Sequence, residues 1–100
     1  MTRREVVVTN ELGLHARAAA RFVHLATQFT SQIRIGRETK MMDGKSIMGI
    51  LLLAAAQGTV LIITANGPDE AAAIDALARL VESRFGESST SLGSGETWNA

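Results

Sequence analysis

The spacing of the hydrophobic residues changes several times along this chain, and these changes limit the possible folds more than any other feature of the sequence. β-Branched residues follow one another at positions 6–9, which predicts a strand that ends near Asn10 and Gly13. From residue 16 to about residue 29, apolar side chains instead recur at steps of three and four, which is typical of an amphipathic helix. The first third of the chain therefore combines a strand with a helix.

The middle of the chain contains the pattern of two short strands and a short helix. Apolar and polar residues alternate over 32–36, which predicts a strand, and a turn leads from it to a second short strand near 40–42. An Asp-Gly turn follows. Ser46 then precedes an apolar stretch at 47–53, which predicts a short helix that Gly58 terminates.

The last third predicts the strongest strand and a second amphipathic helix. Residues 59–65 alternate between two apolar faces, one formed by Leu61, Ile63 and Ala65. A helix is expected to open at 67–70, where a proline stands early and two acids face the positive end of the helix dipole, and to stop at Gly86. Its apolar stripe comprises Ile74, Leu77, Val81 and Phe85. Asp75 and Arg79 form an i,i+4 pair on the same helix.

The resulting order of elements is β-α-β-β-α-β-α. Helices separated by single strands or by one hairpin favour an antiparallel or mixed sheet with all helices on one face, an α+β sandwich. The other face of the sheet would then be open to water. We expect three apolar residues there, Val7, Val60 and Ile62, and scattered apolar residues of this kind do not by themselves indicate an interface.

Composition limits the function classes. The 100 residues suit one domain, which we expect to span residues 1–87, and the Ser/Thr/Gly-rich residues 88–100 predict a disordered tail. The absence of Cys excludes disulfides, thiolate metal sites and a Cys nucleophile. Ten basic residues balance ten acidic ones and only 4% of residues are aromatic, which disfavours nucleic acid as a partner. The longest apolar run, residues 50–56, is too short to span a membrane and no signal peptide precedes it, so we expect a cytoplasmic protein.

The stretch from Asn10 to Ala19 is the part of the sequence that points to chemistry. His15 lies just outside the amphipathic helix or at its first position, where the backbone N–H groups of Ala16, Arg17 and Ala18 lack intrahelical acceptors. With the helix dipole, these groups form an anion site. A neutral imidazole is a competent nucleophile near pH 7, so His15 can accept a phosphoryl group whose oxygens bind those N–H groups and the Arg17 guanidinium.

A plainer interpretation makes His15 a polar helix cap and Arg17 a solvated charge, and on spacing alone it is the commoner situation. Other chemistries have less support. His15 and His24 are nine residues apart and leave the helix on opposite faces, so they cannot share a metal ion, and His24 is expected at the surface. No nucleophile elbow and no Gly-rich phosphate loop occur, so we expect neither a hydrolase nor a bound metal or cofactor.

Two motifs resemble those of a known family. Thr9-Asn10, followed by Leu-Gly-Leu-His-Ala-Arg at 12–17, resembles the active-site signature of HPr, the histidine-containing phosphocarrier of the bacterial phosphoenolpyruvate-dependent phosphotransferase system. Lys-Ser-Ile-Met-Gly at 45–49 resembles the second signature of the family, around its regulatory serine. Both stand in the family's order and spacing. The resemblance implies an open-faced β-sandwich in which three helices cover one face of a four-stranded antiparallel sheet.

The same resemblance implies roles for particular residues. His15 would take a phosphoryl group on Nδ1 from phosphorylated enzyme I and pass it to an enzyme IIA component, and Arg17 would bind the phosphate. Ser46 would be phosphorylated by HPr kinase/phosphorylase, which would add negative charge beside an apolar docking surface. That partner surface would comprise Ala20, Ile47, Met48 and Leu51. We expect a monomer that carries phosphate between enzymes and is not itself an enzyme.

Two positions depart from the family pattern, and two other functions stay open. The family commonly has Pro at the position of Ala18, and the replacement by Ala should loosen the loop but preserve its chemistry. The family also commonly has a small polar residue at the position of Leu52. The first alternative is a nitrogen- or carbon-regulatory phosphocarrier that signals by its phosphorylation state. The second is a binding module that acts through phosphorylated Ser46, with His15 idle.

Overall fold

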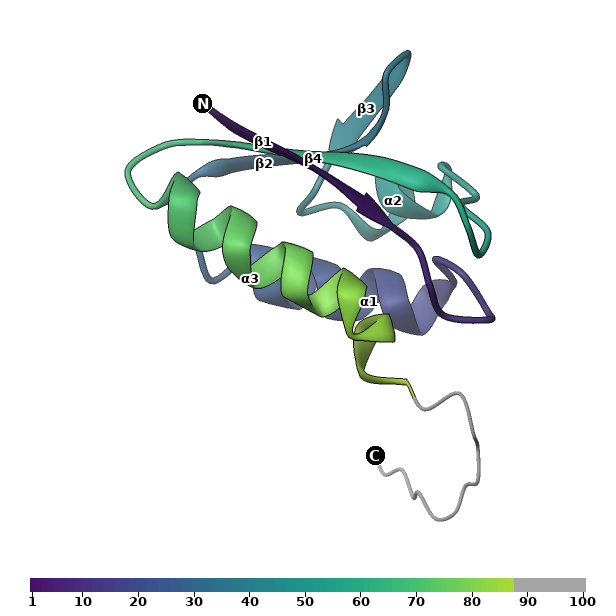
Figure 1. The fold of residues 1–100 in the computed structure, drawn as a ribbon. Helices are drawn as coiled ribbons and strands as arrows, with labels where there is room; N and C mark the ends of the chain where they lie inside the picture. The colour runs from purple at the N-terminus through teal and green to yellow at the C-terminus, as the bar shows by residue number, and fades with distance from the viewer. Residues whose placement is uncertain (88–100) are drawn as a thin grey trace.

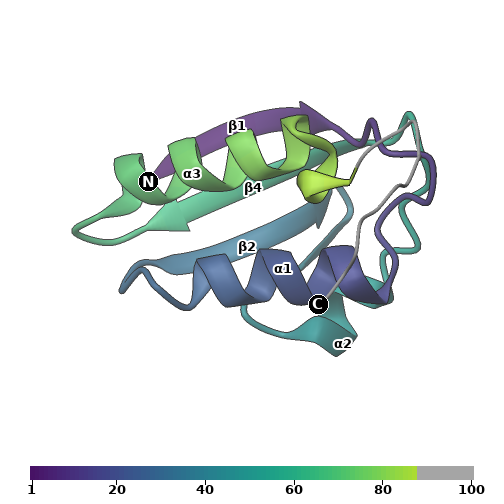
Figure 2. The same ribbon diagram turned by 90° about the horizontal axis from the view of Figure 1, so that it is seen from below.

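Four strands and three helices form an open-faced sandwich in the computed structural model, which describes residues 1–87 (Figure 1). The tail expected at residues 88–100 lies outside the described residues. Helices α1 and α3 lie side by side on one face of the sheet (Figure 2), and α2 contacts both α1 and β3. The elements are β1 (Thr2–Val7), α1 (Ala16–Ala26), β2 (Gln32–Arg37), β3 (Lys40–Asp43), α2 (Ile47–Leu51), β4 (Val60–Asn66), α3 (Glu70–Glu82) and a 3₁₀ turn, η1 (Arg84–Gly86).

Every strand pairing in the sheet is antiparallel, which resolves the choice between an antiparallel and a mixed sheet. The strand order is β1-β4-β2-β3, so the last strand in sequence lies between the first two. Val6 stands opposite Leu61 across β1 and β4, and Ile33 stands opposite Ala65 across β2 and β4. Because paired residues share a face, these buried side chains form one apolar layer that α1 and α3 cover.

The apolar residues predicted to line one face of each strand and one side of each helix are buried in this core. Ile33 and Ile35 of β2 are buried, whereas Arg34 between them is exposed. Phe22 of α1 and Leu77 of α3 are completely buried on the opposite side of the same core. Burial of one such aliphatic or aromatic side chain contributes about 1.5–3 kcal/mol relative to its exposure.

One of the three residues expected on the open face is buried. Val7 and Val60 are exposed there, as predicted, but Ile62 is only 7% exposed. Ile62 lies on the central strand β4 in a row with Glu5 of β1 and Gly36 of β2. Glu5 and the residues diagonal to Ile62 on both neighbouring strands can lean over it and over the space that Gly36 leaves, whereas Val60 at the start of the strand has fewer such neighbours.

The helices end earlier than the sequence pattern predicted. α1 ends at Ala26 and not near residue 29, and α2 ends at Leu51, well before Gly58. α3 begins at Glu70, so Pro68 precedes the helix, and Phe85 belongs to η1, where its φ is 55°. Phe85 is nevertheless completely buried, which explains why it continued the apolar pattern of the helix without being part of it.

Two carboxylates at the start of α3, Asp69 and Glu70, bind backbone and hydroxyl groups of other parts of the chain. Asp69 accepts hydrogen bonds from the backbone N–H groups of Thr30 and Ser31, at 2.9 and 3.0 Å, and from the Ser31 hydroxyl. The Ser31 hydroxyl and the Thr30 N–H group lower the pKa of Asp69 from 3.8 to about 2. Glu70 accepts from the Thr2 hydroxyl and from the Gly67 N–H group, which lower its pKa to about 2 as well.

Candidate functional site

The loop between β1 and α1 is held against the segment that follows α2. Leu14 N–H donates to the carbonyl of Ala55 at 2.8 Å, and Gly13 N–H donates to the carbonyl of Asn10 at 3.1 Å. Gly13 has φ +68°, and a Cβ atom at this position would lie 2.6 Å from the Ala55 carbonyl oxygen. Glycine is therefore required both by the backbone conformation and by the close approach of the two loops. This contact fixes the chain two residues before His15.

His15 is the N-cap residue of α1. Its carbonyl accepts the first helical hydrogen bond, from Ala19 N–H at 2.8 Å, and its ring nitrogen Nδ1 accepts from the backbone N–H of Arg17 at 3.2 Å. A nitrogen that accepts a hydrogen bond carries its lone pair, so the ring proton resides on Nε2. The imidazole is partly exposed, with 27% of its side-chain surface accessible. His15 thus presents an unprotonated Nδ1 at the start of a helix.

Two residues that the sequence did not single out as site residues complete the surroundings of the imidazole. The carboxylate of Glu87 accepts from Nε2 of His15 and also from the Asn10 side-chain amide, at 3.0 Å. The same Asn10 amide donates to the carbonyl of Gly13 at 2.7 Å, and Asn10 is only 2% exposed. Asn10 could have been suspected from its place in the first motif. Glu87 carried no signal, because it stands 72 positions from His15 at the edge of the expected tail.

The 3₁₀ turn η1 brings Glu87 to His15. After α3, the buried Phe85 takes a left-handed backbone conformation, and the Arg21 guanidinium of α1 donates to its carbonyl. Glu87 N–H then donates to the carbonyl of Arg84 at 2.9 Å. The turn contacts α1, so the described end of the chain and the start of α1 meet at one end of the molecule (Figure 2).

The three N–H groups from which the anion site was predicted lie at the start of α1, and one of them differs from the expectation. Ala16 and Arg17 are exposed and Ala18 is buried, so the first helical turn is open to solvent on the side of Arg17. The sequence suggested that the N–H group of Arg17 has no acceptor within the protein. In the structure it donates a hydrogen bond to Nδ1 of His15. The cap forms because the imidazole nitrogen is a good acceptor within reach of the helix N-terminus.

Ser46, which was expected to precede a short helix, is the N-cap residue of α2. Its hydroxyl oxygen accepts from the N–H group of Gly49 at 3.1 Å, and its carbonyl accepts from Ile50 N–H at 3.1 Å. The residue is half-buried. Its hydroxyl proton is not used in the cap, because the oxygen acts there as an acceptor.

An apolar surface is formed by α1 and α2. Ile47, Met48 and Leu52 are exposed, Met48 to 70%, and Ala20 is exposed on α1, which contacts α2. We call these four residues the α1–α2 surface. Leu51, the other residue expected on it, is half-buried and packs against the core.

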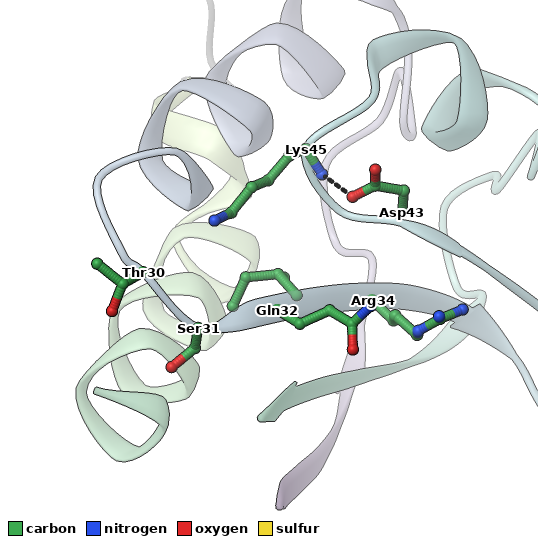
Figure 3. A pocket seen from close by; sticks show the side chains of 7 residues that line it. Thr30, Ser31, Gln32, Arg34, Asp43 and Lys45 are labelled. Carbon is green, nitrogen blue, oxygen red and sulfur yellow. Dashed lines mark hydrogen bonds between the residues drawn. The ribbon is translucent and has the colours of Figure 1, made fainter. Parts of the chain in front are cut away.

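A hollow of about 340 Å³ lies apart from these residues, between the start of β2 and the end of β3 (Figure 3). Asp43 accepts a hydrogen bond from the backbone N–H of Lys45 at 2.9 Å, and the ammonium group of Lys45 donates to the carbonyl of Phe29 at 2.8 Å.

Within residues 1–87, no group of three His, Asp or Glu residues could hold a metal ion. None of the described helices is long and apolar enough to cross a membrane.

Comparison with known proteins places these features in a family. The family described as "PTS HPr component phosphorylation site" matches residues 2–83. The chain belongs to the HPr family. It is 46% identical over 87 residues to phosphocarrier protein HPr of Cupriavidus necator, an alignment that covers 87% of this chain and 98% of that protein. HPr proteins are phosphocarriers of the phosphotransferase system and not enzymes in the usual sense, so that part of the sequence interpretation is confirmed.

Solved HPr structures have the same fold. A crystal structure of HPr from Thermoanaerobacter tengcongensis superimposes with a TM-score of 0.84 at 46% identity, covering 88% of this chain and 99% of that one. The open-faced sandwich with a four-stranded antiparallel sheet is thereby confirmed. A crystal structure of an HPr dimer from the same organism has a TM-score of 0.69 at 47% identity, covering 87% of this chain and all of that one. The existence of that dimer leaves the expected monomeric state of this chain untested.

Proposed function

We propose that this HPr carries a phosphoryl group on Nδ1 of His15, which it accepts from phosphorylated enzyme I and passes to an enzyme IIA component. The observation that carries the proposal is the hydrogen bond from the Arg17 N–H group to Nδ1. That bond requires a lone pair on Nδ1, and a lone pair is what a nucleophile needs. Membership of a phosphocarrier family supports the same role.

The start of α1 then supplies the binding site for the transferred group. When phosphorus bonds to Nδ1, the N–H group of Arg17 loses its acceptor nitrogen and can donate to a phosphoryl oxygen instead. The N–H groups of Ala16 and Ala18, also in the first helical turn, point in the same direction, and the positive end of the helix dipole favours the added charge. The guanidinium of Arg17 is the cation of this proposed site.

Partner docking is assigned to the α1–α2 surface and its regulation to Ser46. Weak, transient complexes need a small, adaptable contact, and exposed Met48 beside Ile47 provides one. Ser46 caps the helix that carries both residues, so its phosphorylation by HPr kinase/phosphorylase would place about −1.5 to −2 charges at the edge of the surface. An acidic partner would then be repelled.

The relay is proposed to operate in the cytoplasm, in line with the family. We keep the monomer as the working state, since each partner would need access to the same His15 site. The sequence-based alternative of a regulatory phosphocarrier uses the same His15 chemistry and differs only in the acceptor.

Phosphorylation by enzyme I tests the carrier role. Incubation with enzyme I, phosphoenolpyruvate and magnesium should give an acid-labile, base-stable adduct, with phosphorus bonded to Nδ1 by ³¹P and ¹⁵N NMR. His15→Ala should form no adduct. His24→Ala is the matched control, because His24 is exposed on the same helix, and it should be phosphorylated at the normal rate. An adduct that persists in His15→Ala would refute the proposal.

A further inference from the structure

We infer that Glu87 is a positioning residue for the transfer, which holds the imidazole of His15 in the Nε2–H tautomer and stabilises the phosphorylated ring. The inference rests on the proposed function of His15. It assigns a role to a carboxylate that no sequence motif identified and that reaches the site only through the fold.

The hydrogen bonds around the imidazole are complementary. Nδ1 accepts from a backbone N–H group, while Nε2 faces a carboxylate, which when ionised can only accept. Each contact therefore favours the same tautomer. An imidazole with the proton on Nδ1 would lose the bond to Arg17 N–H and would set the Nε2 lone pair against the carboxylate oxygen of Glu87.

Glu87 is itself fixed in place. One carboxylate oxygen accepts a hydrogen bond from Nε2–H of His15, and the other accepts from the Asn10 amide at 3.0 Å, so both oxygens have partners. Asn10 is buried and bonded to the Gly13 carbonyl in the loop that precedes His15. The Glu87 side chain is only 17% exposed, which reduces the screening of its charge by water. The carboxylate is thus tied to the same loop as the imidazole that it contacts.

The charge of Glu87 matters after the phosphoryl group arrives. In the transfer, the Nδ1 lone pair forms a bond to phosphorus while the bond from phosphorus to the donor atom of enzyme I breaks, and that donor atom keeps the electron pair. His15 gives up no proton, so the ring retains its Nε2–H and becomes a cation. A carboxylate in hydrogen-bond contact with this cation lowers the free energy of the phosphorylated state relative to the unphosphorylated one.

Two substitutions separate the geometric effect from the charge. Glu87→Gln retains an acceptor oxygen for Nε2–H and removes the charge, whereas Glu87→Ala removes both. Glu82→Gln is the matched control, because Glu82 is an exposed carboxylate at the end of α3. Far-UV circular dichroism establishes that each variant is folded. If Glu87→Ala does not fold, Glu87→Gln alone carries the test through its equilibrium measurement.

The first measurement is the tautomer of unphosphorylated His15, read from the ¹⁵N chemical shifts of its two ring nitrogens at a pH where the ring is neutral. The parent protein and Glu82→Gln should show the Nε2–H tautomer alone, and Glu87→Ala should show a mixture of both tautomers. A parent protein with the proton on Nδ1, or a Glu87→Ala variant with the parent's shifts, would overturn the inference. This measurement involves no phosphorylation and is therefore independent of the proposed function.

The second measurement is the equilibrium of phosphoryl exchange with enzyme I. Loss of a charge-assisted hydrogen bond should shift the equilibrium about tenfold toward phosphorylated enzyme I in both Glu87 variants, and less than twofold in Glu82→Gln. If the parent protein is phosphorylated on His15 but the Glu87 variants have the parent's equilibrium, the inference about Glu87 fails and the carrier role stands. If His15→Ala is phosphorylated, the carrier role fails.

Discussion

Gly13→Ala should destabilise the protein much more than Gly58→Ala, although both glycines have a positive φ. At Gly13, φ is +68° and a Cβ atom would lie 2.6 Å from the carbonyl oxygen of Ala55. At Gly58, φ is +92° and a Cβ atom would have no neighbour within 4 Å. The pair therefore separates the cost of a left-handed backbone from the cost of pushing apart the two loops that hold His15.

The expected magnitudes follow from these contacts. A side chain in the left-handed conformation costs about 1–2 kcal/mol, and the reduced freedom of the unfolded chain offsets about 0.4–1 kcal/mol of it. Gly58→Ala should thus lower the free energy of unfolding by about 0–1.6 kcal/mol. Gly13→Ala must also displace the Ala55 carbonyl, which accepts from Leu14 N–H at 2.8 Å, and an unpaired buried N–H group costs about 1–3 kcal/mol more.

Urea unfolding followed by far-UV circular dichroism measures both free energies, and an unchanged slope with denaturant would show that the two variants unfold in the same way. The rate of His15 phosphorylation by enzyme I is the second readout. It should fall about tenfold or more in Gly13→Ala, because small displacements of a reacting group are costly, and stay within about twofold in Gly58→Ala. Losses of stability that agree within about 0.5 kcal/mol would refute the argument that the contact with Ala55 requires glycine.

Two further predictions concern Ser46 and Asp69. Ser46→Ala should lower the free energy of unfolding by about 1 kcal/mol in urea, since it removes the cap to Gly49 N–H, whereas Ser46→Asp should retain the cap and slow phosphorylation by enzyme I more at low than at high salt. Equal rates at both salt concentrations would contradict a charge effect. Asp69 has its pKa lowered from 3.8 to about 2 in the folded protein, so its carboxylate stabilises the fold above pH 3.8 and this contribution disappears as the pH falls through about 2. Asp69→Asn should accordingly be less stable near pH 7 and should lose less stability between pH 4 and pH 2, as measured by thermal unfolding across that range; a pH dependence equal to that of the parent would contradict it.

The core was predictable from the sequence because its pattern is local. Alternation at Ile33 and Ile35 and helical spacing around Phe22 each report which side of one element is buried, and both were confirmed. The ends of the helices were less predictable, because contacts from distant parts of the chain determine them. Asp69 binds the backbone of Thr30 and Ser31, 39 and 38 residues away, and no local pattern announces such a bond.

The residues of the candidate site also differ in whether the local sequence could predict them. His15 at the N-cap and Ser46 at the N-cap are local features, since capping depends on the residue and on the helix that follows it, and both were found in the predicted positions. Glu87 depends on a left-handed backbone at Phe85 and on a bond from Arg21 of another helix. No spacing rule connects residues 72 positions apart.

This division bears on how the proposed carrier works. In the proposed carrier, residues 9–17 supply the nucleophile and the anion site, and the Arg17 N–H group already favours the tautomer with the proton on Nε2. The contact from the far end of the domain reinforces this preference, because an ionised carboxylate at Nε2 accepts a hydrogen bond and cannot donate one. A substitution of Arg21, which donates a hydrogen bond to the Phe85 carbonyl of η1, should therefore loosen the turn that carries Glu87. We expect it to alter the His15 tautomer although residues 9–17 are unchanged. The chemistry of the motif is in this sense completed by the fold.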